Sequence, residues 1–175
     1  MRKIESDTCE NIPRDAVVTA IDYADGQRFA LHRHNRGQFA YAACGVITVF
    51  TDQGNWVVPP QRAIWVPAGV PHEMSMNGPV TMLNTYIRGP ASARLGLPAQ
   101  CQVFGISPLL HQLLIQATDI PALYDETRRE GLLMNLLLHE IAAMPALSLN
   151  APLPAEPRLA RACRALLEQL DLAKR

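Results

Sequence analysis

The sequence has no apolar run long enough to cross a membrane and no recognisable export signal. A membrane-spanning helix needs roughly 18 or more consecutive apolar residues, and no segment approaches that length. The chain starts with MRKIESD, which lacks the apolar segment of a secretory signal. These absences predict a cytoplasmic protein that does not contact a membrane.

Paired cysteines and a surplus of charge of one sign are also absent. The C-x-x-C pairs of zinc ribbons and redox motifs do not occur, and the four cysteines are scattered, at Cys9, Cys44, Cys101 and Cys163. This usage fits a reducing compartment. The 16 basic and 16 acidic residues give a formal net charge of zero, whereas autonomous nucleic-acid-binding domains usually present a basic face. We therefore expect these 175 residues to bind a small molecule or another protein.

The first ninety residues are rich in short segments of β-branched and aromatic residues. Turn formers such as Asn35–Gly37, Asp52–Gly54 and Pro67–Gly69 separate these segments. Eight short strands with turn signals at regular intervals predict an antiparallel sandwich or barrel. The predicted strands are Val17–Tyr23, Arg28–His34, Gln38–Ala42, Val46–Thr51, Asn55–Val58, Ala63–Val66, His72–Met76 and Val80–Ile87.

Helical patterns replace the strand patterns between residues 91 and 144. Ser107 and Pro108 supply a capping hydroxyl and a first-turn proline for a helix over Ser107–Thr118. A longer helix is expected over Asp125–Met144, where leucines recur at helical spacing. Its apolar stripe is wide enough for two roles, which are packing on the barrel and a homodimer interface through residues 107–118 and 125–144.

A proline-rich stretch over residues 145–157 predicts an extended linker. Residues 158–175 then restart an amphipathic helix, with Leu159, Cys163, Leu166 and Leu170 on one face. A single amphipathic helix after a linker has nothing of its own to pack against. We interpret it as the first helix of a truncated C-terminal domain.

Three histidines and one glutamine carry the clearest chemical signal. His32 and His34 are one residue apart on a predicted strand, so we expect their side chains on one face. Gln38 follows a short turn, and His72 lies downstream, after a second turn. Three imidazoles and a carboxamide that converge inside a barrel form either a divalent-metal site or a polar ligand pocket.

The spacing of these residues resembles the two sequence motifs of the cupin superfamily. The pattern G-x5-H-x-H-x3-Q-x6-G, from Gly26 to Gly45, matches the first motif, with Gln38 where a glutamate is usual. The pattern P-x-G-x2-H, which ends at His72, matches the core of the second motif, although its usual leading glycine is Gln61 here. The segments 38–51 and 54–72 resemble the sensor half of AraC-family transcriptional regulators.

This resemblance implies a mostly β fold, with a cupin barrel (a double-stranded β-helix or jelly roll) over residues 1–90 and C-terminal α-helices after it. It also implies the effector-sensing and dimerisation domain of a DNA-binding transcriptional regulator, in which only the missing C-terminal domain contacts DNA. The alternative from another class is a stand-alone metal-dependent cupin enzyme, such as a dioxygenase or an isomerase. Glu73 is expected on the opposite strand face from its neighbour His72, which makes it a poor general base and favours binding over catalysis.

The resemblance also implies the site residues. In metal-binding cupins, the positions of His32, His34, Gln38 and His72 hold one divalent ion, here expected to be zinc, nickel or iron. Gln38 is neutral and offsets none of the ion's charge, so a polar pocket without a metal stays open as the second interpretation. A small-molecule effector is expected to meet aromatic side chains and a basic clamp for an anionic group, although buried tryptophans are more often core residues. These effector-contacting residues are Tyr41, Trp56, Arg62 and Trp65.

Overall fold

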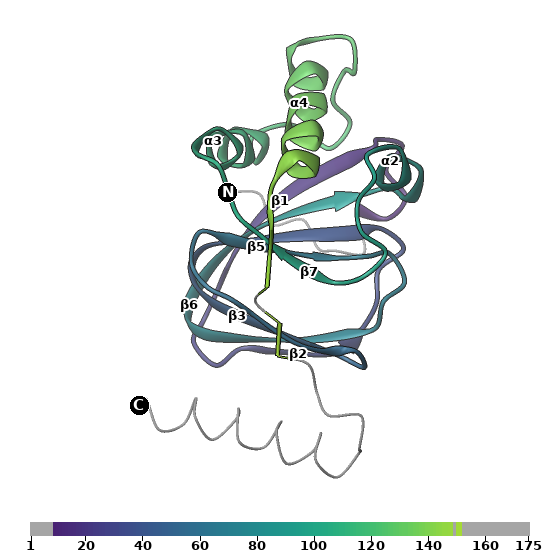
Figure 1. Cartoon of the computed structure of the whole chain (residues 1–175). Coiled ribbons are helices and arrows are strands. Elements are labelled where there is room, and N and C mark those ends of the chain that lie inside the picture. Colours follow the sequence, from purple (N-terminus) through teal and green to yellow (C-terminus); the bar gives the residue numbers. More distant parts are fainter. Residues whose placement is uncertain (1–8, 149, 152–175) are drawn as a thin grey trace.

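Two long antiparallel strands, β3 (Gly37–Thr51) and β6 (His72–Ile87), form the spine of the molecule. The structure is a computed structural model that describes residues 9–148 and 150–151. Within these residues, β3 and β6 belong to a nine-stranded sheet that curls into a barrel, and helices lie on one side of it (Figure 1). This arrangement confirms the predicted cupin barrel followed by α-helices.

The shorter strands pair with successive halves of this spine. β6 pairs with β2 (Arg28–His32) along its first half and with β1 (Ala16–Tyr23) along its second half. β3 pairs with β5 (Arg62–Val66) along its first half and with β4 (Gly54–Val58) along its second half. Each half of the spine is therefore flanked by two strands, one half by β1 and β5 and the other by β2 and β4, and the sheet bends where the halves meet.

The bend in β3 lies at Gly45, where the register against β6 shifts between Ala42 and Val46. Gly45 has a φ of 73°, and a Cβ at this position would lie 2.4 Å from the carbonyl oxygen of Pro79. Only glycine fits this backbone conformation and this close approach without strain. The sequence predicted a break near the middle of both long strands, whereas the structure keeps each strand continuous.

Three further strands lie outside the predicted barrel of residues 1–90. β7 (Gln102–Phe104) pairs with β5, β8 (Ala146–Leu147) pairs with β7, and β9 (Asn150–Ala151) pairs with β4. Residues 146–147 and 150–151, which lie in the first half of the expected linker, complete strand edges that would otherwise have unpaired backbone groups. The predicted helix over residues 158–175 lies outside the described residues.

The helices lie on one side of the barrel in Figure 1 and are α2 (Gly89–Arg94), α3 (Pro108–Ala117) and α4 (Arg129–Ala143). The predicted cap of α3 is confirmed, since the Ser107 hydroxyl oxygen accepts a hydrogen bond from the backbone N of Leu110 at 3.0 Å. The predicted start of the longer helix at Asp125 is wrong. The Asp125 carboxylate accepts hydrogen bonds from the backbone N and hydroxyl of Thr127 at 2.9 and 2.7 Å, which holds a turn there and delays the helix.

Alternation along the strands divides the buried residues into two apolar clusters. One cluster fills the barrel interior and includes Ala40 of β3 and Met82 of β6. The other lies between the outer face of the sheet and the helices, and includes Phe39 of β3, Leu114 of α3 and Leu137 of α4. Consecutive residues of β3 thus face different clusters. Within residues 9–148 and 150–151, no helix combines the length and the apolarity that a membrane span requires.

A short N-terminal segment, residues 9–15, is fastened to the turn between β2 and β3, and we call it the strap. Asn35 donates hydrogen bonds from its backbone N and its Nδ2 to the Glu10 carboxylate, at 3.0 and 2.6 Å. Arg36 is only 3% exposed. Its guanidinium donates to three carbonyls of the strap, which belong to Glu10, Ile12 and Arg14.

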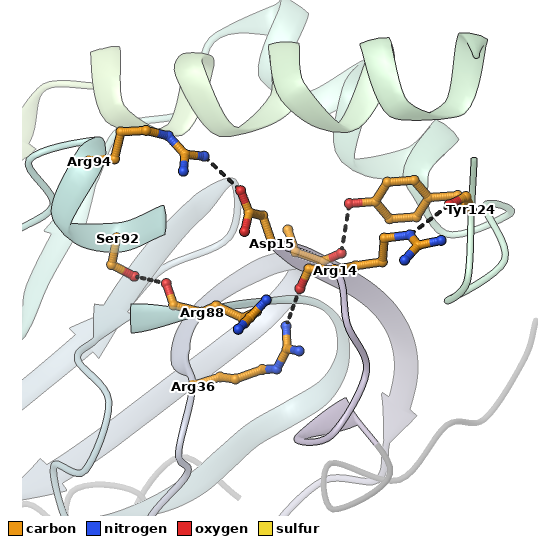
Figure 2. A network of polar contacts seen from close by, with 8 residues as sticks. Arg14, Asp15, Arg36, Arg88, Ser92, Arg94 and Tyr124 are labelled. Atoms are coloured by element: carbon orange, nitrogen blue, oxygen red, sulfur yellow. Dashed lines mark hydrogen bonds and ion pairs between the residues drawn. The ribbon is translucent and has the colours of Figure 1, made fainter. Parts of the chain in front are cut away.

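The other end of the strap is tied to the helical side of the molecule (Figure 2). Arg14 Nε donates to the carbonyl of Tyr124 at 2.7 Å, and its guanidinium lies 5.4 Å from the centroid of the Tyr124 ring. The Tyr124 hydroxyl donates to the carbonyl of Ala16 at 3.3 Å. Asp15 forms an ion pair with Arg94 of α2 at 2.7 Å. The strap therefore connects the turn after β2 with α2 and with the segment before α4.

Replacement of Arg36 by methionine is expected to destabilise the domain. The Arg36→Met variant removes the shared donor of three strap carbonyls, so its free energy of unfolding should fall by about 2–4 kcal/mol. Urea denaturation followed by tryptophan fluorescence measures this change. The matched control is Arg33→Met, since Arg33 is an exposed arginine of the same turn and should change stability by at most about 0.5 kcal/mol. Equal unfolding midpoints for the two variants would contradict the assigned role of Arg36.

Candidate functional site

Three histidines from three neighbouring segments converge at one end of the spine. His32 ends β2, His34 lies in the turn that follows, and His72 begins β6 opposite His32 in the register. Ring centroids are 4.3 Å apart for His32 and His72, 4.9 Å for His32 and His34, and 5.4 Å for His34 and His72. One nitrogen of each ring lies within 4.8 Å of the other two. The structure thus brings together the three histidines that the sequence predicted as one site.

His34 reaches this site by a different route from the predicted one. β2 stops at His32 and not at His34, and its register against β6 shifts between Phe29 and His32. The backbone N of Gly69 donates to the carbonyl of His34 at 2.8 Å, which ties this turn to the turn before β6. His34 therefore approaches its partners from a turn, so the expectation of alternation along one strand was wrong.

Backbone carbonyls orient two of the imidazoles. Nδ1 of His32 lies 2.7 Å from the carbonyl oxygen of Ala30, and Nδ1 of His72 lies 2.9 Å from that of Val70. Because a carbonyl only accepts hydrogen bonds, each Nδ1 carries the hydrogen and donates it. Each Nε2 then presents a lone pair when the ring is neutral. Histidine ligands of metal ions are oriented by the same kind of hydrogen bond.

The surroundings of His72 favour its neutral form. The residue is 1% exposed, and its Nε2 has no hydrogen-bond partner. Burial lowers the pKa of His72 from 6.5 to about 4, since the opposing hydrogen bond to Val70 is the weaker influence and the neighbouring His32 and His34 lower it further. A buried, neutral nitrogen without a partner costs free energy. Its lone pair is therefore available to a ligand.

Gln38 lies on the inner face of β3. In the register it is opposite Tyr86 of β6, whose ring centroid is 5.5 Å from that of His34. Its Nε2 donates to Oδ1 of Asn84 at 2.8 Å, whereas its buried Oε1 has no hydrogen-bond partner. Three imidazole nitrogens and one amide oxygen suit a divalent ion such as zinc, nickel or iron. The three histidines therefore fit the metal site that the sequence motif implies, and Gln38 as its fourth donor stays a prediction.

Tyr41 and Trp65, which were expected to contact an effector, lie on the other face of the sheet. Both belong to the apolar cluster beneath the helices. The Tyr41 hydroxyl shares a hydrogen bond with Nδ1 of His111 at 2.6 Å, and Trp65 Nε1 donates to the carbonyl of Pro98 at 2.8 Å. Since Gln38 faces inward, strand alternation turns Tyr41 outward. The structure therefore brings neither residue to the histidine cluster.

Trp56 and Arg62 have contacts of their own elsewhere in the barrel. Trp56 faces the barrel interior and, with Cys101 and Leu147, lines a cavity of about 450 Å³ beside β4, β7 and β8. The three clustered histidines do not line this cavity. Arg62 begins β5, and its guanidinium donates to the carbonyl of Gln61 at 2.8 Å. Contact of either side chain with an effector stays a prediction.

The sequence interpretation missed two residues of this region, Asn84 and Tyr86. A signal for Asn84 was present, because it is an amide among the apolar inward positions of the strand predicted over Val80–Ile87. A buried amide in such a position needs a hydrogen-bond partner on a neighbouring strand. If the strand predicted over Val80–Ile87 had been paired with the strand that carries Gln38, Gln38 would have been identified as the partner of Asn84.

Comparison with known proteins agrees with this architecture. A family described as the AraC-like ligand binding domain matches residues 16–142, which include the barrel strands β1–β7, α2, α3 and all but the last residue of α4. The chain belongs to the AraC-like ligand-binding domain family. The predicted resemblance to the ligand-binding domains of the AraC family is therefore confirmed.

A curated regulator and a solved structure are similar to this AraC-like domain. The HTH-type transcriptional regulator NimR of Escherichia coli (strain K12) is 30% identical over 132 residues, which cover 74% of this chain and 46% of NimR. The chain thus spans about half the length of that curated relative. The fatty-acid-bound ToxT of Vibrio cholerae superposes with a TM-score of 0.54 and 7% identity, over 72% of this chain and 52% of ToxT. The likeness to ToxT shows a shared fold.

The stability of the metal-free AraC-like domain is expected to depend on pH through His72. Unfolded His72 has an ordinary pKa of 6.5, whereas the folded residue has a pKa of about 4. As the pH falls, the unfolded state takes up this proton first. The contribution of His72 to the free energy of unfolding is therefore fully present above pH 6.5 and is lost between about pH 6.5 and 4.

Urea denaturation of EDTA-treated protein at a series of pH values measures this dependence. The variant His72→Gln cannot take up this proton, so its stability should change less steeply over the same pH interval. Identical slopes for the two proteins would show that other groups cause the pH dependence.

Proposed function

We propose that this chain is the effector-sensing domain of a helix-turn-helix transcriptional regulator, and that a divalent metal ion forms part of its effector site. The convergence of His32, His34 and His72 carries this proposal. Membership of the AraC-like family and the similarity to NimR, an HTH-type regulator, support the regulatory role. DNA binding is assigned to a separate domain of the full-length protein.

Four neutral donors would hold the ion. They are Nε2 of His32, Nε2 of His72, a ring nitrogen of His34 and Oε1 of Gln38. When bound, the ion supplies a positive centre that accepts an anionic oxygen as a further ligand. None of the four donors offsets its charge, so an anionic effector is favoured over a neutral one. The proposed effector class is a small molecule with a carboxylate or a similar anionic group.

The proposed role is binding without catalysis. Catalysis at a cupin metal centre needs a general base close to the bound substrate. Glu73 is exposed while its neighbour His72 is buried, so this carboxylate does not share the inner face with the histidines. If a substrate were turned over and the turnover were lost on chelation and in His34→Ala, the enzymatic alternative would replace this proposal.

The strap supplies the proposed route from the site to the helices. Asn35 and Arg36 follow His34 directly and hold the strap by their side chains, and Arg14 holds the segment before α4 through the Tyr124 carbonyl. An effector that restrains the His34 turn would favour one arrangement of the strap over another. Because the effector would bind one arrangement more tightly than the other, its binding would shift the population toward that arrangement and so move the helices.

The exposed face of α4 supports a homodimer as the partner arrangement. Leu137 and Ile141 of the predicted stripe pack inward, whereas Leu132 and Leu136 are 67% and 45% exposed. These two exposed leucines are four residues apart and therefore share one face of the helix. Leu109 of α3 is also exposed. We propose that α3 and α4 form the dimer interface, because apolar faces of this kind are common where subunits meet.

Metal binding is the first test of this function. Untagged, EDTA-treated protein titrated calorimetrically with zinc, nickel or iron(II) should bind one ion per chain, and His72→Ala should abolish the binding. Gln38→Glu should bind the same ion about tenfold more tightly, because a carboxylate offsets part of its charge. Carboxylate compounds that raise the melting temperature only of the metal-loaded protein would identify the effector class. Absence of binding by the unaltered protein would reject the metal site.

The dimer interface has its own test. The double variant Leu132→Asp/Leu136→Asp places two charges on the exposed face of α4 and should convert a dimer into a monomer in multi-angle light scattering. Leu123→Asp is the matched control, since Leu123 is 65% exposed but lies outside α3 and α4. A dimer that survives the double variant would place the interface elsewhere.

A further inference from the structure

We infer that Asn84 is a positioning residue for Gln38, and that it selects the oxygen end of the Gln38 amide for the histidine cluster. This inference rests on the metal-binding part of the proposed function. It concerns a residue outside the four donors of the cupin motif.

Asn84 and Gln38 meet inside the barrel. Asn84 is 1% exposed and lies in β6 opposite Ala40 of β3, which is two residues from Gln38 and faces the same way. The alanine methyl group leaves the Gln38 side chain room to reach diagonally across to Asn84. Nε2 of Gln38 donates to Oδ1 of Asn84 at 2.8 Å, and both residues are buried. The bond therefore forms where water does not compete for the amide.

A carboxamide has two ends of similar size and opposite polarity. The oxygen end has lone pairs for a cation, whereas the NH₂ end only donates hydrogen bonds and repels a cation. Rotation of the terminal torsion exchanges the two ends at little steric cost. A glutamate needs no such selection because its two oxygens are equivalent. At this position of the motif, glutamine therefore needs a partner that holds its nitrogen.

Asn84 meets that need in the structure, where it presents its Oδ1, an acceptor, to the Gln38 amide. An acceptor at this place binds the NH₂ end of Gln38 and leaves Oε1 free. Oε1 of Gln38 and Nε2 of His72 are both buried and have no hydrogen-bond partner. The hydroxyl of Thr19 lies opposite Asn84 in the register and is also without a partner. Asn84 Oδ1 thus accepts a hydrogen bond from Gln38 and none from Thr19, although Thr19 is its partner in the register.

Cobalt(II) binding tests this role, because its d–d absorption spectrum reports the donor atoms as well as the affinity. Asn84→Leu and the smaller Asn84→Ala both remove the acceptor and should weaken binding by about 10–100-fold, with an altered spectrum. Asn84→Asp keeps an acceptor oxygen and should retain the spectrum of the unaltered protein, with an affinity at least as high, because its carboxylate also favours a nearby cation. The matched control is Thr85→Val, which removes a buried hydroxyl without a partner from the adjacent position of β6.

A double-mutant cycle separates positioning from a general structural effect. If Asn84 acts through Gln38, then Asn84→Leu should have no further effect on cobalt affinity in a Gln38→Ala background. An undiminished loss in that background would overturn the inference, as would unaltered binding in both Asn84→Leu and Asn84→Ala. Circular dichroism and urea midpoints in EDTA establish that each variant is folded. Failure of the unaltered protein to bind cobalt would instead reject the metal site itself, and this inference with it.

Discussion

The pairing of β3 with β6 is the constraint on which the rest of the structure depends. Its register decides which residues of both strands face the barrel interior and which face the helices. Gln38, His72 and Asn84 all lie on these two strands, and all face inward. A register shift by one residue would turn each of them to the opposite face. Gly45 matters for the same reason, because the bulge there lets a single strand serve both halves of the barrel.

The histidine site and the strap share one turn of the chain. His34 belongs to the site. The next residue, Asn35, donates hydrogen bonds to the Glu10 carboxylate of the strap, and Arg36 donates to the carbonyl of Arg14. Any change in the position of this turn therefore acts on both. The strap ends at contacts to α2 and to the segment before α4 (Figure 2). In the proposed function, this short chain of contacts would connect ligand binding at the barrel with the helices.

Much of the fold could be predicted because strand and cap signals are local. Alternation, turn residues and the Ser107 hydroxyl are properties of short segments, and the structure bears them out. The errors occurred where a distant residue decides the outcome. β2 ends early where the backbone of Gly69 binds the His34 carbonyl. Strands β7 to β9 are short segments that pair with edges formed much earlier in the chain, and their own residues carry little signal.

The three histidines of the site were evident from the sequence, because their spacing matches the cupin motifs. The motif spacing also indicated the family that the comparison then matched. The directions of the side chains depend on contacts that form only in the folded protein. Carbonyls of Ala30 and Val70 orient two imidazoles, Asn84 holds one end of the Gln38 amide, and alternation turns Tyr41 and Trp65 toward the helices. The direction of each of these side chains depends on the strand register and on partners up to 46 residues away in the sequence. A local sequence pattern shows neither.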